Sequence, residues 1–263
     1  MIRSEYIHQA AIIEEGAKVE SNVKVGPFCY VGPNVVLKSG VILKNNVTVV
    51  GDTIVGEGTT VFSYATVGEI PQDLKFTGEL TKLVIGKRNQ IRESVTMNTG
   101  TSGGGGVTIV GNDCLFMTGS HVAHDAQIGN NVIMANQSAV AGHCVIEDNV
   151  IIGGLSGVHQ FVRVGRGAII GAVTMVTNDV IPYGMVQASR GELQGLNYVG
   201  LKRSGVSRED ILALRASYEM LKQGDGTFQD RAKSLLKETD SIYVKEVVNF
   251  ILGSTDRSFL VPG

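Results

Sequence analysis

Residues 7–67, divided into blocks of six, read IHQAAI IEEGAK VESNVK VGPFCY VGPNVV LKSGVI LKNNVT VVGDTI VGEGTT VFSYAT V. Each block opens with an aliphatic residue, from Ile7 to Val67, eleven times in succession. Because 43% of the chain is hydrophobic, such a run at one fixed phase has a chance probability on the order of 10⁻⁴. An α-helix repeats every 3.6 residues and a strand every two, so a period of six predicts a different architecture.

The same period returns further along the chain. It resumes at Ile85, Ile91 and Met97, and then runs through Val110, Phe116, Val122, Ile128, Met134, Val140, Ile146, Ile152, Val158, Val164, Ile170 and Val176. In a hexapeptide repeat each unit gives a short strand and a turn, and three units close a triangular coil around inward aliphatic side chains. The sequence therefore predicts a mainly β protein, with a left-handed parallel β-helix over residues 1–186 whose residues stack at steps of 18, about 4.8 Å apart.

Two insertions interrupt the repeats, near residues 69–82 and 99–106. Insertions in repeat proteins usually emerge as loops on one face. The second contains four consecutive glycines but lacks the Gly-Lys-Ser/Thr ending of a phosphate-binding loop, so we expect a flexible connector there.

After Pro182 the period of six fails, and the pattern becomes helical. Ser207 and Thr227 are predicted N-caps of two helices, and a third helix follows. The predicted inward faces are Ile211, Leu214, Tyr218 and Leu221; then Ala232 and Leu235; then Val244, Val247, Val248, Ile251 and Leu252. We expect residues 187–263 to form a linker and a C-terminal α-helical domain that caps the open end of the β-helix.

The composition narrows the classes of function. The formal net charge is -2, with no run of Lys or Arg, so we expect no nucleic-acid partner. No apolar segment has the length of a signal peptide or a membrane span. Cys29, Cys114 and Cys144 form neither a CxxC pair nor an even-numbered disulfide framework, so we expect small core residues and a cytoplasmic protein.

The last coils contain four of the five histidines, which are His121, His124, His143 and His159. At steps of 18, His143 should lie one coil from Asp125, and Gln160 two coils from His124, so these side chains could line one groove with His124 exposed in it. A histidine takes a proton near neutral pH, and a neighbouring carboxylate can fix its tautomer. His124 and Asp125 supply both parts.

Zinc chemistry is an alternative for this cluster. Three histidines can hold Zn²⁺ with an open coordination position, as they do between subunits in the gamma-type carbonic anhydrases, which are also β-helices. The further active-site residues of that branch are absent, and it does not need the two insertions. We therefore expect no metal and no cofactor.

An ordered set of motifs accompanies the histidines. It comprises Gln72-Asp73-Leu74-Lys75, Ile91-Arg92-Glu93-Ser94-Val95-Thr96, His121-Val122-Ala123-His124-Asp125, Ala141-Gly142-His143, Val158-His159-Gln160-Phe161, Gly195-Leu196-Asn197 and Gly200-Leu201-Lys202-Arg203. Over essentially its whole length, the chain resembles the UDP-N-acetylglucosamine acyltransferases, the hexapeptide-repeat enzymes that open lipid A biosynthesis. The resemblance implies transfer of a long 3-hydroxyacyl chain from acyl carrier protein to a UDP-sugar, in a homotrimer with active sites between subunits.

The resemblance also implies residue roles. His124 would deprotonate the sugar 3-OH for direct attack on the thioester, Asp125 would orient it, and the Gly142 N–H would face the oxyanion. Substrate binding would fall to Gln72, Asp73, Lys75, His121, His143, His159, Gln160, Asn197 and Arg203. Ala172 would limit the length of the acyl chain, with alanine permitting a long one.

Several positions depart from the family pattern and leave the acceptor open. Asn98 stands where many members have His, Val199 and Ser204 replace Glu and Arg, and Gln187-Ala188-Ser189 replaces Gln-Gly-Asn. Some relatives acylate the 3-amino analogue of the sugar nucleotide and make an amide in place of an ester.

Three other proteins are rivals to this interpretation. The later N-acyltransferase of the same pathway carries an extra N-terminal domain, whereas here the repeats begin at Ile7. An acetyl-CoA-dependent acetyltransferase would not need so long a β-helix with this helical cap. A non-enzymatic ice-binding or scaffold β-helix would favour a flat Thr-rich face, which the sequence lacks.

Overall fold

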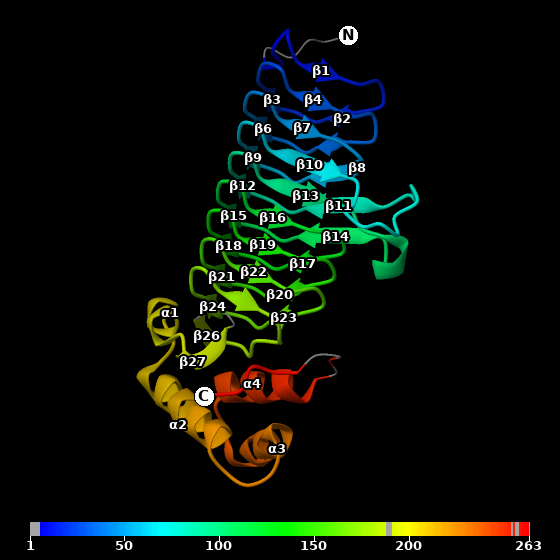
Figure 1. The fold of residues 1–263 in the computed structure, drawn as a ribbon. Coiled ribbons are helices and arrows are strands. Elements are labelled where there is room, and N and C mark those ends of the chain that lie inside the picture. The colour runs from blue at the N-terminus through cyan, green and yellow to red at the C-terminus, as the bar shows by residue number, and fades with distance from the viewer. Residues whose placement is uncertain (1–5, 188–190, 254, 256–257, 263) are drawn as a thin grey trace.

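The computed structural model of the chain describes residues 6–187, 191–253, 255 and 258–262. Short strands recur every six residues, and each pairs in parallel with the strand one coil away (Figure 1). Ile12 pairs with Tyr30 and His121 pairs with Ala139, so an uninterrupted coil takes 18 residues. The predicted parallel β-helix with a C-terminal helical region is confirmed.

The strands form three sheets along the three faces of the coil. The first sheet contains β1 (Ile12–Ile13), β4 (Tyr30–Val31), β7 (Thr48–Val49), β10 (Thr66–Glu69), β13 (Thr96–Asn98), β16 (His121–Val122), β19 (Ala139–Val140), β22 (Gly157–Val158) and β25 (Met175–Val176). The second contains β2 (Lys18–Val19), β5 (Val36–Leu37), β8 (Asp52–Val55), β11 (Lys82–Ile85), β14 (Val107–Val110), β17 (Gln127–Ile128), β20 (Val145–Ile146) and β23 (Arg163–Val164). The third contains β3 (Lys24–Val25), β6 (Ile42–Leu43), β9 (Thr60–Val61), β12 (Gln90–Ile91), β15 (Leu115–Phe116), β18 (Ile133–Met134), β21 (Ile151–Ile152), β24 (Ile169–Ile170), β26 (Gly184–Gln187) and β27 (Glu192–Leu196).

The second residue of nearly every short strand points into the coil and is buried. In the first sheet this inward column is less than 3% exposed from β4 to β25, through Val31, Val49, Val67, Met97, Val122, Val140, Val158 and Val176. Burying a side chain of this size stabilises the fold by roughly 1.5–3 kcal/mol. The period of six is therefore the period of the hydrophobic core. Cys29, Cys114 and Cys144 are buried free thiols in this core, as predicted.

Both insertions leave the coil at the same corner, between the first and second sheets. Thr60 pairs with Gln90, 30 residues away, which is twelve more than in an uninterrupted coil. Gln90 pairs with Leu115, 25 residues away, which is seven more. The extra residues lie in the loops that follow β10 and β13, and these loops project beside β11 and β14 in Figure 1. The register of the strands resumes after each insertion.

Four helices follow the coils. They are α1 (Tyr198–Arg203), α2 (Arg208–Lys222), α3 (Phe228–Glu238) and α4 (Ile242–Leu252). The Ser207 hydroxyl accepts from the Asp210 N–H at the start of α2, and Thr227 forms a reciprocal capping box with Asp230 at α3. The three predicted helices are confirmed, whereas the short α1 was missed. Among the described helices, none is both long and apolar enough to cross a bilayer.

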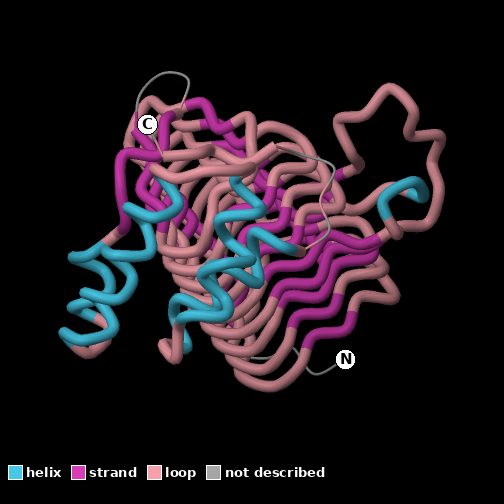
Figure 2. Tube along the Cα trace, turned by 90° about the horizontal axis from the view of Figure 1, so that it is seen from below, coloured by secondary structure: helices cyan, strands magenta, loops and turns pink. Residues whose placement is uncertain are grey.

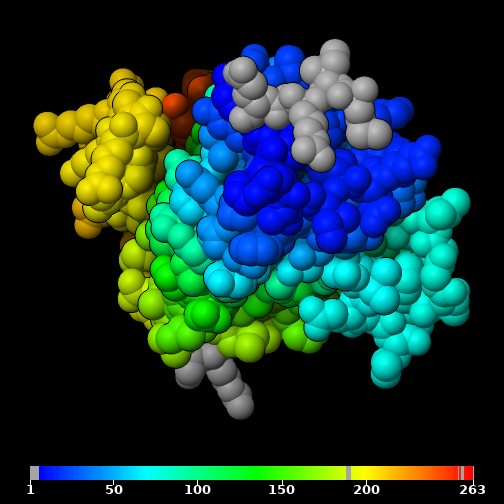
Figure 3. All heavy atoms as spheres, turned by 90° about the horizontal axis from the view of Figure 1, so that it is seen from above, coloured from blue at the N-terminus to red at the C-terminus, as the bar shows by residue number. Residues whose placement is uncertain are grey.

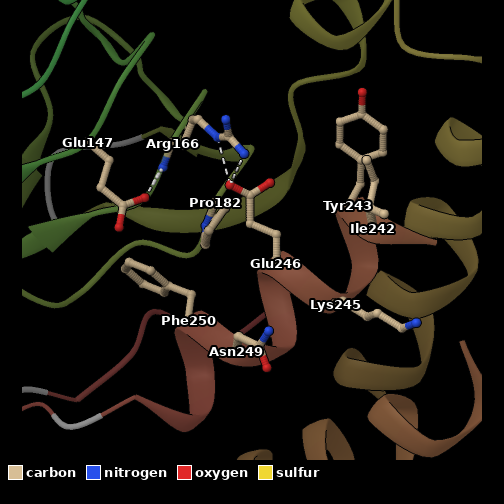
Figure 4. A pocket seen from close by; sticks show the side chains of 9 residues that line it. All are labelled: Glu147, Arg166, Pro182, Ile242, Tyr243, Lys245, Glu246, Asn249 and Phe250. Atoms are coloured by element: carbon tan, nitrogen blue, oxygen red, sulfur yellow. Dashed lines mark hydrogen bonds and ion pairs between the residues drawn. The ribbon is translucent and has the colours of Figure 1, made fainter. Parts of the chain in front are cut away.

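The helices lie against the last coils (Figure 2), and α1 and α2 project on the side opposite the 70–81 loop (Figure 3). One charged cluster joins α4 to the β-helix (Figure 4). Arg166 pairs with Glu246 of α4 at 2.5 Å, and its backbone N–H donates to Glu147 at 2.7 Å. The Tyr183 hydroxyl also donates to Glu246. Because β27 extends the third sheet to Leu196, a domain boundary between residues 186 and 187 stays a proposal.

Candidate active site

A pocket of about 590 Å³ lies on the outer face of the first sheet and at the corner that follows it. Six predicted site residues line it: Gln72, His121, His124, Gly142, His159 and Gln160. Its remaining lining is mostly small or apolar: Ala123, Ala139, Ala141, Gly157, Val158 and Met175. The pocket therefore combines polar groups at the corner with an apolar floor along β19 and β22.

His124 and Asp125 form a buried hydrogen-bonded pair at this corner. The Nδ1 atom of His124 lies 2.8 Å from Oδ2 of Asp125. Since an ionised carboxylate only accepts hydrogen bonds, the ring donates from Nδ1 and keeps Nε2 as a proton acceptor. The predicted pairing of the two residues is present.

The exposure expected for His124 is wrong, because only 5% of its side chain is accessible in the single chain. Gly142 packs directly against the imidazole. A Cβ atom at position 142 would lie 2.5 Å from Cε1 and 2.7 Å from Nε2 of the ring. Only glycine therefore leaves room for the histidine in this position.

Gly142 also meets the requirement for an oxyanion donor. Among the described residues, no acceptor satisfies its backbone N–H, and the residue lines the pocket beside His124. An unpaired backbone N–H next to a proton acceptor is the arrangement that acyl transfer requires.

The stacking predicted at steps of 18 places three residues above one another. Asp125, His143 and Phe161 all have left-handed backbones, with φ of 59°, 62° and 67°. The His143 ring stacks on Phe161 with centroids 4.5 Å apart and meets the His124 ring edge-on at 4.9 Å. Its Nδ1 lies 3.7 Å from Oδ2 of Asp125, which is too far for a hydrogen bond. Phe161 was one step of 18 from His143 but was not predicted as a site residue.

Burial lowers the pKa of both neighbouring histidines. For His143 the nearby Asp125 carboxylate opposes this shift, but burial dominates. For His121 burial also dominates, and the Nδ1 atom is 2.7 Å from the Thr96 hydroxyl. Both imidazoles are therefore neutral at neutral pH and can act as hydrogen-bonding groups toward a ligand.

The glycine-rich insertion contacts the site directly, so its expected role as a flexible connector is wrong. It contains a short 3₁₀ helix, η1 (Ser102–Gly104), and the preceding Thr101 binds the carboxylate of Asp125. The Thr101 N–H donates to Oδ1 at 2.8 Å and its hydroxyl donates to Oδ2 at 2.6 Å. The Asp125 N–H donates in turn to the Thr108 hydroxyl at 2.8 Å. Sequence reasoning missed both threonines because the insertion breaks the steps of 18.

The two insertions are joined to each other. Oε1 of Glu79, in the first insertion, accepts from the N–H and hydroxyl of Ser102 at 3.3 and 3.2 Å. The Thr81 hydroxyl donates to that of Thr99 at 3.0 Å, and both residues are buried. The loop that carries Gln72 is thus fixed to the loop that holds Asp125.

The other predicted residues lie at varying distances from the pocket. Asp73 and Lys75 are in the first insertion, and their charges act on His143 with opposite signs. Ala172 is exposed in a turn next to Gly153. Ala188 and Ser189, two of the departures from the family pattern, lie outside the described residues.

Asn197 and Arg203 lie in the region of α1, away from the pocket within the single chain. The Asn197 side chain accepts from the Gly200 N–H at 3.0 Å and donates to the Gly167 carbonyl at 3.3 Å. It thereby caps α1 and holds it to the coil. Arg203 is exposed in the last turn of the helix.

The same residues were tested as a metal site. His124, Asp125 and His143 offer ligand atoms that all lie within 4.8 Å of one another. However, Oδ2 of Asp125 already accepts from Thr101 and from His124, and the hydrogen on Nδ1 prevents that atom from binding a metal. The donor set fits a carboxylate-oriented base better than a zinc centre.

The comparisons with known proteins point in one direction. The model of the second domain of UDP-N-acetylglucosamine O-acyltransferases matches residues 179–260, and the bacterial transferase hexapeptide model matches residues 107–142. A relative from Paracoccus denitrificans (strain Pd 1222), named acyl-[acyl-carrier-protein]–UDP-N-acetylglucosamine O-acyltransferase, is 61% identical over 77% of each chain. A relative of the same name from Caulobacter vibrioides is 48% identical over 81% of this chain and 82% of its own.

Solved structures agree with these relatives. A crystal structure of a UDP-N-acetylglucosamine acyltransferase has a TM-score of 0.94 at 40% identity and covers 98% of this chain and 99% of its own. The Arabidopsis UDP-N-acetylglucosamine acyltransferase has a TM-score of 0.85 at 30% identity, with 97% and 99% covered. The identity and the coverage are both too high for a likeness of fold alone, and the chain belongs to the UDP-N-acetylglucosamine O-acyltransferase family.

Proposed function

We propose that this chain transfers a long 3-hydroxyacyl group from acyl carrier protein to the 3-position of UDP-N-acetylglucosamine, as the first step of lipid A biosynthesis in the cytoplasm. The names of the relatives support the donor and the acceptor. The observation that carries the chemistry is the His124–Asp125 pair, which leaves Nε2 of His124 as a proton acceptor.

The reaction needs no covalent intermediate on the protein. Nε2 of His124 takes the proton from the sugar 3-OH as the oxygen attacks the thioester carbon. The carbonyl electrons move to an oxyanion that faces the Gly142 N–H. When the intermediate collapses, the C–S bond breaks and the imidazolium returns its proton to the departing thiolate. The products are the sugar ester and the free thiol of the carrier protein.

The pocket lining supports the substrate-binding roles proposed for the other residues. Gln72, His121, His159 and Gln160 supply polar groups around His124. Outward-facing Ala139 and Gly157 leave an apolar floor that suits an acyl chain, and Met175 lines the pocket one coil further along. Asp73, Lys75 and His143 act together at the mouth of the site, and their charges influence one another.

A homotrimer would explain two features of the single chain. Asn197 and Arg203 lie away from the pocket, so they contribute to sugar-nucleotide binding only if another subunit is adjacent. Leu74 and Leu80 of the first insertion are fully exposed, and such apolar side chains favour contact with a second copy. We propose that the active sites form between subunits and that catalysis requires no metal.

The 3-amino sugar nucleotide stays the alternative acceptor. Asn98, which replaces a family histidine, is only 3% exposed. Its side-chain amide donates to the carbonyls of Ile70 and Glu69 at 2.9 and 3.3 Å. It thus holds the start of the first insertion, and mass analysis of the product is needed to distinguish ester from amide.

The test is an acyl-transfer assay with mixed 3-hydroxyacyl donors on acyl carrier protein and the two sugar nucleotides. We expect His124→Ala to lower turnover by about 10²–10⁴-fold, because the general base is lost. Since His124 is buried, its removal leaves Asp125 without a partner and should cost about 1–3 kcal/mol of stability. His8→Ala is the matched control, because His8 lies in the first coil. Turnover above half of the wild-type value in a folded His124→Ala trimer would refute the mechanism.

A further inference from the structure

Thr101 holds the carboxylate of Asp125 with two hydrogen bonds, one from its backbone N–H and one from its hydroxyl. It is the N-cap residue of η1, where a threonine hydroxyl usually accepts from an N–H of the following turn. Within the described residues, Thr101 makes no such cap bond. Its hydroxyl is used for the active site and not for the helix.

The turn that follows Thr101 covers the carboxylate. A Cβ atom at Gly104 would lie 2.1–2.5 Å from the carboxyl atoms of Asp125. A Cβ at Gly100 would lie 2.8 Å from Oδ1. Glycines at these positions therefore let the backbone approach closely, and the Asp125 side chain is only 1% exposed. Water cannot replace the threonine as a donor without displacing this turn.

The orientation of the carboxylate decides which histidine it supports. Oδ2 accepts from the Thr101 hydroxyl at 2.6 Å and from Nδ1 of His124 at 2.8 Å. Nδ1 of His143 is 3.7 Å from the same oxygen. A modest rotation of the carboxylate would allow it to bond His143, and His124 would then lose the acceptor that fixes its tautomer.

We propose that Thr101 is a positioning residue: it fixes the carboxylate of Asp125 so that Nδ1 of His124 stays protonated and Nε2 stays available as the base. The proposal rests on the proposed function, because it acts through His124. Thr101 touches neither the imidazole nor the pocket lining. The glycine-rich insertion is therefore part of the catalytic apparatus.

Thr101→Val tests this proposal. Thr101 has φ -124° and ψ 156°, which suits a β-branched residue, so valine removes the hydroxyl and preserves the shape. Loss of a hydrogen bond to a charged group should lower kcat by about 10-fold, with KM changed less than about twofold. With one donor fewer, the carboxylate holds the imidazolium more strongly, so the acid limb of the pH–rate profile should move to higher pH.

Three further variants separate positioning from a general loss of structure. Thr101→Ser keeps the hydroxyl and should restore kcat to within about twofold of wild type. Thr99→Val is the matched control: it removes a buried hydroxyl from the same insertion that bonds to Thr81 and not to Asp125. Thr101→Ala removes the hydroxyl without adding volume, so that overpacking by valine does not decide the result.

Wild-type turnover and an unshifted pH profile in folded Thr101→Val or Thr101→Ala would overturn the proposal. An equal loss in Thr99→Val would also overturn it, because the insertion would then act only through its general packing. If His124→Ala stays active, the proposed function fails. An inactive His124→Ala beside a fully active Thr101→Val refutes only the role of Thr101.

Discussion

Replacing Gly142 by alanine tests the steric relation between the oxyanion donor and the base. The new Cβ would lie 2.7 Å from Nε2 and 2.5 Å from Cε1 of His124. Since non-bonded carbon and nitrogen atoms need about 3.5 Å, the ring must withdraw by about 0.8–1 Å. The Asp125 carboxylate is held on its other side by Thr101, so the ring cannot move without losing its 2.8 Å hydrogen bond.

A misplacement of about 1 Å at a reacting group can lower the rate by about 100-fold. We therefore expect kcat/KM to fall by about that factor in Gly142→Ala, with a stability loss of about 1–3 kcal/mol from overpacking. The assay is steady-state acyl transfer beside thermal unfolding. Gly32→Ala is the control, because a Cβ there meets its nearest atom, Cα of Val50, at an ordinary 3.4 Å. Activity within threefold of wild type in Gly142→Ala would refute this reasoning.

Three further outcomes are expected. Arg203→Ala should chiefly raise the KM for the sugar nucleotide, because a guanidinium pairs with phosphate; unchanged KM with reduced kcat would contradict this role. Ala172→Met should shift the preferred donor by several carbons toward shorter chains, and an unchanged donor profile in a folded trimer would exclude Ala172 as a ruler. Because burial lowers the pKa of His143 below 6.5, the unfolded chain binds a proton first, so the free energy of unfolding should fall as the pH drops below about 6.5. His143→Asn should reduce this slope in urea titrations, since asparagine tolerates the left-handed backbone; an equal slope would assign the effect to other groups.

The period of six was sufficient to predict the β-helix, because the same residue of each block fills the core. The step of 18 also placed His143 beside Asp125, as the 3.7 Å separation confirms. The step depends only on the regular backbone of the coil, so sequence numbers convert directly into positions.

The same rule could not predict the contacts made by the insertions. Thr101 precedes Asp125 by 24 residues, which is no multiple of a coil, and its contact depends on how seven extra residues fold. The burial of His124 was also missed, because it depends on how closely Gly142 packs one coil away. Side-chain packing at a corner follows from three-dimensional shape, which a count of residues does not contain.

The constant length of a coil restricts how this chain can gain or lose residues. Adding a whole coil would translate everything beyond it by about 4.8 Å along the axis without turning it. Adding one hexapeptide would turn the rest by a third of a revolution and carry His159 to a different face from His124. The two natural insertions avoid this rotation because the chain leaves and re-enters at one corner. Insertions and deletions between His121 and Gln160 should therefore be confined to such loops, whereas the number of coils before β16 can vary.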